Sequence, residues 1–243
     1  MITLLIVTAV TILPKGNKYH VTFLDVEHGD SSVLFNDKKN ECVVIDGGGK
    51  GNSEKDVGTY NVYPYIKYLG IRKIDYAVAS HTDRDHIKGI IELCNLTDVS
   101  NVIVPDVNNE GDLYERLIKI CKAKNINIYK MKNGDELKLG AMHFKCIYPF
   151  DDTYKLNLGT NNSSLVLICE IYGKKILYAG DIEGEAESMI LEKGIDIDCD
   201  ILKVAHHGSK TSSTGSFIEK VNPSYAIVSG NYSNIKTFNS VQK

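Results

Sequence analysis

The segment His81–His86 reads HTDRDH and holds two histidines and two aspartates within six residues. Imidazole nitrogens and carboxylate oxygens are ligands for divalent metal ions. Alternate side chains of an extended loop point the same way, so His81, Asp83 and Asp85 could converge while His86 faces a second centre. This spacing suits two metal ions about 3.5–4 Å apart that share ligands. The alternative is a polar strand-to-helix turn in which Asp85 caps the following helix.

Two later segments offer the remaining ligands. Asp181 follows the apolar run KILYA across one glycine, and His207 follows the run ILKVA. An aspartate placed like Asp181 can bridge two cations, or it can cap the helix that begins near Glu183. His206 could face a substrate cleft or could be a hydrogen-bonded structural histidine. The set of three histidines and three aspartates favours zinc through its imidazoles, and its oxygen ligands admit manganese or magnesium.

A dinuclear site of this kind has a definite chemistry. A bridged pair of divalent ions lowers the pKa of bound water to near 7, supplies hydroxide at neutral pH, and stabilises charge on the attacking and leaving oxygens. Phosphodiester hydrolysis has this charge pattern. It needs no protein nucleophile, and the sequence has no G-x-S-x-G nucleophile elbow. Asp85 and His206 are the side chains expected to take part in catalysis.

The elements that position these residues are short apolar strands alternating with helices. Each polar group follows the carboxyl end of a strand, where ligands collect in α/β proteins. The predicted strands are Tyr19–Val26, Ser31–Phe35, Cys42–Asp46, Ile74–Ser80, Asn101–Pro105, Ile126–Met131, Glu136–Leu139, Met142–Tyr148, Ser163–Tyr172, Lys175–Ala179, Asp200–Ala205 and Tyr225–Gly230. The predicted helices are Tyr60–Leu69, His86–Leu96, Asp112–Lys124, Glu183–Glu192 and Ser213–Val221. The pattern predicts one domain of two packed sheets with helices outside, a layered α/β fold.

Composition narrows the function classes. The chain has 243 residues, of which 43% are hydrophobic and 24% charged, as in an ordinary globular protein. The net charge of −3 gives no electrostatic reason to expect general nucleic-acid binding, because dedicated nucleic-acid-binding proteins usually carry a basic stripe. The six cysteines are scattered singly, which argues against thiolate zinc sites and predicts small buried hydrophobic residues.

The first 15 residues form a separate apolar segment, MITLLIVTAVTIL followed by Pro14 and Lys15. The segment is shorter than the ~20 residues of a membrane-spanning helix. It also lacks the basic start of a signal peptide. It is interpreted as the remnant of a membrane segment, a weak anchor or a strand, and residues 16–243 as the hydrolase domain.

Several motifs together resemble the metallo-β-lactamase superfamily. They are FLDVEHGDSSVLF, VVIDGGG, SHTDRDH, NNSSLVL, LYAGDIE and LKVAHHGS, in this order. They look most like the branch that forms the C-terminal domain of ComEC-type competence proteins, and the similarity runs from Val21 to Gly230. The resemblance implies a four-layer αββα sandwich with a two-metal site, Zn or Mn, between the loop ends of the sheets.

Carried over by position, the superfamily's H-x-H-x-D-H motif falls on His81, Asp83, Asp85 and His86, with Asp83 replacing its second histidine. The resemblance gives Asp181 as the bridging ligand and His207 as the last histidine ligand. Asp46 matches a strand-end aspartate that supports the metal loop.

Other positions depart from the family pattern. The central histidine ligand of many superfamily hydrolases has no counterpart, and its region carries Asn161 and Asn162, expected to bind substrate. His28 replaces a common glutamine and is expected to line the cleft. The chain also ends where the family typically continues, which raises the alternative of truncation.

The leading hypothesis is a metal-dependent phosphodiesterase, with single-stranded DNA as a candidate substrate as in competence proteins. The alternatives are hydrolysis of a small phosphoester such as a phosphocholine ester, hydrolysis of a thioester or lactam, and a non-catalytic module with an incomplete metal site. A competence-like protein would be membrane-associated, through the N-terminal segment, or extracytoplasmic; otherwise the protein would be cytoplasmic.

Overall fold

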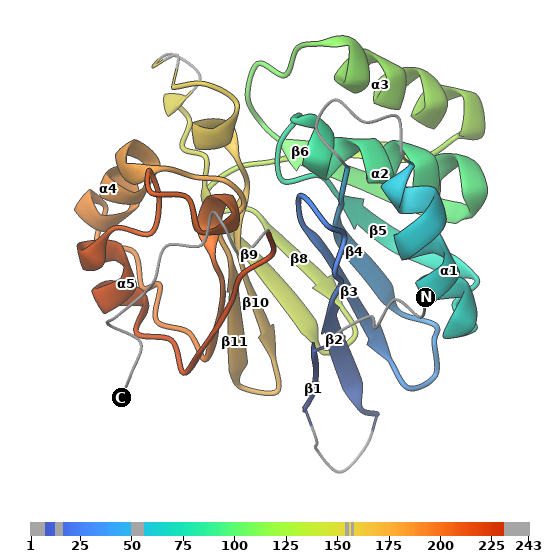
Figure 1. Ribbon diagram of the computed structural model, residues 1–243, viewed down its shortest axis with the longest axis horizontal. Coiled ribbons are helices and arrows are strands. Elements are labelled where there is room, and N and C mark those ends of the chain that lie inside the picture. Colours follow the sequence, from blue (N-terminus) through green and yellow to red (C-terminus); the bar gives the residue numbers. More distant parts are fainter. Residues whose placement is uncertain (1–7, 13–16, 50–55, 154–155, 157, 231–243) are drawn as a thin grey trace.

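The computed structural model describes residues 8–12, 17–49, 56–153, 156 and 158–230. These residues form two sheets that stack face to face, with helices on both outer faces (Figure 1). The predicted four-layer αββα sandwich is confirmed.

The first sheet has seven strands in the order of the chain. They are β1 (Thr8–Ile12), β2 (Tyr19–Phe23), β3 (Ser31–Asn36), β4 (Cys42–Gly47), β5 (Lys73–Val78), β6 (Asp98–Pro105) and β7 (Asn127–Met131). Strands β1 to β4 are antiparallel neighbours, whereas β4 to β7 run parallel. The parallel connections contain a π-helical turn (Gly58–Val62), α1 (Tyr63–Tyr68), α2 (Arg84–Leu96) and α3 (Asp112–Lys124).

The second sheet has six strands in the order β13-β12-β11-β10-β9-β8. They are β8 (Glu136–Leu139), β9 (Met142–Tyr148), β10 (Val166–Ile171), β11 (Lys174–Tyr178), β12 (Ile201–Lys203) and β13 (Tyr225–Ile227). Strands β11, β12 and β13 run parallel, so their carboxyl ends lie at one edge. Helix α4 (Gly184–Glu192) follows β11, and α5 (Gly215–Val221) follows β12.

Three apolar clusters separate the layers. Strand β4 shows why the sequence builds them, because its side chains alternate between faces. Val43 and Ile45 belong to the cluster between the sheets, whereas Cys42 and Val44 belong to the cluster under α1, α2 and α3. A third cluster lies under α4 and α5. All six cysteines are free and buried, as predicted for small hydrophobic residues.

The chain ends are described only in part. Thr8–Ile12 of the apolar N-terminal segment pairs antiparallel with β2, while residues 1–7 and 13–16 lie outside the described residues. Within the described ranges no helix combines the length and apolarity needed to cross a membrane. The C-terminal departure from the family pattern, residues 231–243, also lies outside the described residues.

Helix α2 crosses the end of β4 at a glycine–glycine contact. A Cβ atom added to Gly89 would lie 1.9 Å from the carbonyl oxygen of Gly47. Because the Gly47 oxygen belongs to the backbone and cannot rotate away from the added Cβ atom, we expect Gly89→Ala to lower the free energy of unfolding by about 1–3 kcal/mol. Urea unfolding of the metal-free protein measures the change.

The control is Gly184→Ala at the start of α4, where the nearest atom to an added Cβ lies 3.6 Å away. This helical position favours alanine, so we expect no loss of stability there. An equal loss at both positions would contradict the close-contact explanation.

Candidate metal centre

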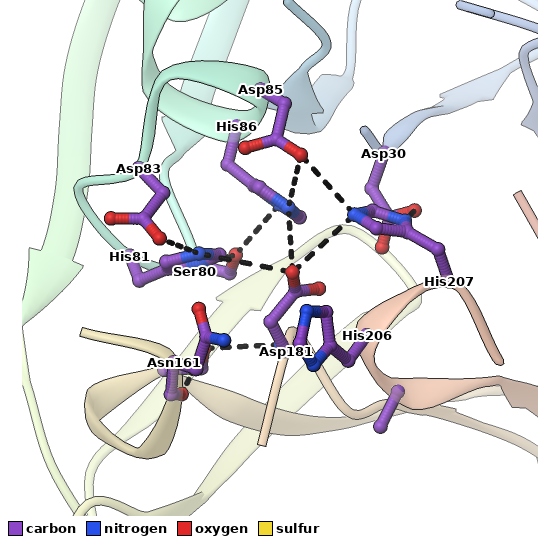
Figure 2. Close-up of polar contacts among 12 residues, drawn as sticks. Asp30, Ser80, His81, Asp83, Asp85, His86, Asn161, Asp181, His206 and His207 are labelled. Atoms are coloured by element: carbon purple, nitrogen blue, oxygen red, sulfur yellow. Dashed lines mark hydrogen bonds and ion pairs between the residues drawn. The ribbon is translucent and has the colours of Figure 1, made fainter. Parts of the chain in front are cut away.

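The ligand-type side chains meet where the carboxyl ends of strands from both sheets come together (Figure 2). The loop after β5 carries the HTDRDH segment, which runs into α2. Asp181 follows β11 and His207 follows β12. Since parallel strands end at one edge, segments separated by more than 100 residues contribute to one site.

Four side chains form the centre of the group. Asp85, His86, Asp181 and His207 each offer a ligand atom, and these atoms all lie within 4.8 Å of one another. Asp181 Oδ2 lies 3.2 Å from His86 Nε2 and 3.3 Å from His207 Nε2. Asp85 Oδ2 lies 3.3 Å from His207 Nε2. Four donors at this separation can surround one divalent ion.

His81 and Asp83 lie on the other side of Asp181. His81 Nε2 is 3.7 Å from Asp83 Oδ2 and 4.0 Å from Asp181 Oδ2. Asp181 therefore faces both halves of the site, as a bridging ligand must. Asp83 is 41% exposed, whereas the side chains of His81 and Asp181 are buried.

The helix-cap interpretations of two aspartates are excluded. Helix α2 begins at Arg84 with Asp83 in the cap position, and α4 begins at Gly184 with Glu183 in the cap position. Neither Asp85 nor Asp181 is a cap residue, so both carboxylates are available to the site.

Buried ligand atoms without hydrogen bonds fit a metal ion. His81 Nε2, His86 Nε2, His207 Nε2 and Asp181 Oδ1 are buried and have no hydrogen-bond partner. Leaving a buried polar atom unsatisfied costs about 1–3 kcal/mol, so such atoms are rare unless a ligand engages them. A divalent ion would use these lone pairs, and the mixture of imidazole and carboxylate donors suits it.

A second set of groups orients the histidines. Asp46 Oδ2 lies 3.1 Å from His86 Nδ1, and Asp46 Oδ1 accepts a hydrogen bond of 2.7 Å from the Ser80 backbone N–H. Ser80 Oγ lies 3.1 Å from His81 Nδ1. Carboxylate partners of this type fix the ring orientation of metal-binding histidines and leave the other nitrogen for the metal.

His207 forms an ion pair with a carboxylate, Asp30, that the sequence analysis missed. Asp30 Oδ1 lies 3.2 Å from His207 Nδ1, and Asp30 Oδ2 lies 2.6 Å from Lys203 Nζ. Asp30 and Lys203 are both buried. A lysine inside the apolar strand ILKVA was the available signal, because a buried lysine requires an acidic partner.

Burial lowers the histidine pKa values and the close carboxylates raise them, and the balance differs from one histidine to the next. Burial opposes protonation of His86, but Asp181 and Asp46 outweigh it and raise the pKa of His86 well above its usual value. Burial and the neighbouring His86 lower the pKa of His81. Asp30, together with Asp181 and Asp85, overcomes burial and raises the pKa of His207 to about 11. The metal-free site therefore holds protons that a metal ion must displace.

We expect metal affinity to rise with pH for this reason. Metal-bound imidazole is neutral, so binding releases the protons of His207 and His86. The apparent association constant should increase about tenfold per pH unit for each proton released between pH 7 and 9. Chelator competition measures the affinity, and calorimetry in two buffers of different ionisation enthalpy counts the protons. A pH-independent affinity would contradict this electrostatic account.

We expect the free energy of unfolding of the metal-free protein to fall as the pH rises, whereas the metal affinity increases. The unfolded pKa of histidine is about 6.5, and the pKa of folded His207 is raised to about 11. The stabilisation from its ion pairs is therefore fully present below pH 6.5 and is lost as the pH rises toward 11.

Four other residues predicted for the site lie around its edge or outside it. His28 is partly exposed, with Nε2 3.3 Å from Asp85 Oδ2. His206 Nδ1 lies 3.1 Å from Glu183 Oε1. The backbone carbonyl of Asn161 accepts a hydrogen bond from Ser164 Oγ, which itself accepts one from the backbone N–H of Asp181. The side chain of Asn162 is used elsewhere: it donates to Glu185 and accepts from the backbone N–H of Glu183. The structure therefore does not bring Asn162 into the site.

The site also holds three non-glycine residues with left-handed backbone. The φ angles are 58° for Asp46, 46° for His206 and 53° for His207. Such conformations cost about 1–3 kcal/mol each and persist where surrounding structure enforces them, often at functional sites.

Sequence comparison finds a matching family model and similar proteins. The family model described as the metallo-β-lactamase superfamily matches residues 25–230. ComE operon protein 3 of Bacillus subtilis is 29% identical over 226 residues, covering 88% of this chain and 28% of that protein. Recombination protein 2 of Haemophilus influenzae is 26% identical over 213 residues, covering 87% of this chain and 24% of that protein. The chain thus spans about a quarter of the length of these relatives.

One solved structure has a similar fold. It comes from Parabacteroides distasonis and is described as a metal-dependent hydrolase. It superposes with a TM-score of 0.53 at 18% identity, covering 90% of this chain and 86% of the other. At this identity the likeness concerns the fold alone.

Proposed function

Because the chain belongs to the metallo-β-lactamase superfamily, we propose that it is a metal-dependent hydrolase of phosphodiester bonds. The observation that carries the proposal is the group of Asp85, His86, Asp181 and His207, whose ligand atoms lie within 4.8 Å of one another. The unsatisfied nitrogens of His81, His86 and His207 support it, since they point to a divalent ion as their missing partner.

Two ions are proposed, with Asp181 between them. Asp85, His86 and His207 would hold one ion, and His81 and Asp83 the other. Bound divalent ions supply an activated water near neutral pH and neutralise charge on phosphoryl oxygens. The ion held by Asp85, His86 and His207 would have more protein ligands than the other ion, so we expect it to bind more tightly.

The chain's own residues keep the ligands in place. Asp46 and Asp30 face the Nδ1 atoms of His86 and His207, at 3.1 and 3.2 Å, so that each Nε2 is directed toward the site. The side chains of Asp83 and His28 are partly exposed, and we propose that a substrate phosphoryl group arrives beside them. His206, held by Glu183, is proposed to contact the substrate there.

Two arguments favour a phosphodiester as the substrate, namely the chemistry of dinuclear metal sites and the names of similar proteins. Oxygen-rich dinuclear sites stabilise both oxygens of an in-line displacement at phosphorus. Relatives that are named competence and recombination proteins make DNA a candidate substrate. We therefore include single-stranded DNA in the test.

The test is hydrolysis by protein reconstituted with zinc, manganese or magnesium and analysed for metal content. The substrates are bis-p-nitrophenyl phosphate, a labelled single-stranded oligonucleotide, a phosphocholine ester, a thioester and a β-lactam. We expect one to two metal equivalents and turnover of the phosphodiesters. Turnover of the thioester or lactam alone would overturn the phosphodiesterase assignment, and well under one equivalent of metal would favour a non-catalytic module.

A further inference from the structure

His28 lies beside the candidate metal centre, in the loop between β2 and β3. Its Nε2 lies 3.3 Å from Oδ2 of Asp85, and its ring centroid lies 5.5 Å from that of His207. The four described side chains whose ligand atoms gather within 4.8 Å of one another do not include it. His28 therefore contacts a proposed metal ligand but stands outside the group that could surround the ion.

Three imidazoles approach the carboxylate of Asp85. Its Oδ2 lies 3.3 Å from Nε2 of His28, 3.3 Å from Nε2 of His207 and 3.9 Å from Nε2 of His86. His86 and His207 would bind the ion through the lone pair of Nε2, and a nitrogen that uses its lone pair in this way carries no hydrogen to donate. Of the three, His28 is the imidazole that can still donate Nε2–H to Asp85 when the ion is bound.

The backbone of the same loop packs closely against Asp85. At Gly29 the φ angle is 85°, and an added Cβ atom would lie 1.9 Å from the carbonyl oxygen of Asp85. The next residue, Asp30, places its Oδ1 3.2 Å from Nδ1 of His207. One short loop thus reaches two proposed ligands of the same ion, and its tight packing fixes the position of His28 relative to the turn that carries Asp85.

From these contacts we infer that His28 is a positioning residue of the metal centre, which donates Nε2–H to the Asp85 carboxylate and holds it toward the ion. This inference rests on the proposed metal-dependent function. The distance of 3.3 Å is close to the usual N–H···O range of about 2.7–3.2 Å. A carboxylate has about four lone-pair sites, so Asp85 can bind the ion and accept this hydrogen bond together.

The test measures the affinity for zinc, the ion that imidazole ligands favour, by competition with a chelator. We expect His28→Ala to lower the association constant of the more tightly bound zinc ion by about 10–100-fold, as for other hydrogen-bond partners of metal ligands. His28→Gln should restore it to within about threefold of wild type, because the glutamine amide keeps an N–H donor at a similar distance from the backbone. Zinc sites use imidazole, thiolate and carboxylate ligands, so restoration by an amide identifies a hydrogen-bond donor.

The matched control is His143→Ala. Nε2 of His143 also lies near a carboxylate, 2.9 Å from Oε2 of Glu136, but this pair stands on β9 and β8, away from the strand ends that carry the metal centre. The control should keep the zinc affinity of the wild-type protein. Unchanged affinity in His28→Ala would overturn the inference, and so would equal losses in the alanine and glutamine variants, which would indicate that His28 binds the ion itself.

The zinc measurement contains no substrate, so it separates this inference from the proposed function. If the wild-type protein and His28→Ala bind zinc equally well, the metal centre stands and the positioning role fails. If the wild-type protein binds no zinc, both fail together. A raised KM for bis-p-nitrophenyl phosphate in His28→Ala at unchanged zinc affinity would assign His28 to substrate binding and overturn the positioning role.

Discussion

Asp181→Asn is expected to lower kcat/KM for phosphodiester hydrolysis by at least about 10³-fold and to weaken metal binding by at least about 100-fold. Substitution of residues that merely support metal ligands costs about 10–100-fold, and loss of a shared ligand should cost more. Asp181 is central because its Oδ2 lies 3.2 Å from His86 Nε2, 3.3 Å from His207 Nε2 and 4.0 Å from His81 Nε2. The measurements are steady-state kinetics and chelator competition.

The control is Asp196→Asn, which removes a carboxylate that pairs with Lys175 on the surface. This change should leave both quantities near the wild-type values. A circular dichroism spectrum identical to wild type establishes that the Asp181 variant is folded. Wild-type metal affinity in the Asp181 variant would refute the candidate metal centre.

Lys203→Met is expected to lower the free energy of unfolding by about 3–5 kcal/mol. It removes one partner of a buried ion pair and leaves the carboxylate of Asp30 without its main counter-charge. The side chains of Lys203 and Asp30 are only 3% and 6% exposed, and their charged atoms are 2.6 Å apart. Urea unfolding measures the loss, and the melting temperature should fall by about 10 °C.

The chain provides a matched surface pair. Lys174 Nζ also lies 2.6 Å from an aspartate, Asp200, but these side chains are 59% and 30% exposed. Lys174→Met should therefore cost about 1 kcal/mol or less. The double change Asp30→Asn with Lys203→Met should recover part of the stability, because it removes the uncompensated charge. Equal losses in the two single lysine variants would contradict the role assigned to burial.

The elements of the fold were largely predictable from local patterns. Helix α3 begins and ends at the predicted residues, Asp112 and Lys124, because its apolar positions repeat every four residues. Strand ends were less predictable, and β12 stops at Lys203 instead of Ala205. Its last predicted residues enter the turn that holds His207, where contacts with other strands decide the backbone conformation.

The candidate ligands were predictable in identity, because each combines a ligand-type side chain with the end of an apolar run. Apart from Asp46, their supporting residues were not. Asp30 and Lys203 carry no distinctive spacing relative to the ligands, and their contacts with each other and with His207 depend on distances between the two sheets. The motif of Asn162 predicts substrate binding, and only the structure shows that its side chain is hydrogen-bonded to Glu183 and Glu185.

The sequence by itself therefore determined the element types, the layered fold and the chemical types at the strand ends, because these follow from periodicity and local chemistry. Only the tertiary structure decided that Asp181 faces both His81 and His86 of the HTDRDH segment. The physical reason is that sheet stacking and strand order set the distances between residues far apart in the chain, and ligand sharing depends on those distances.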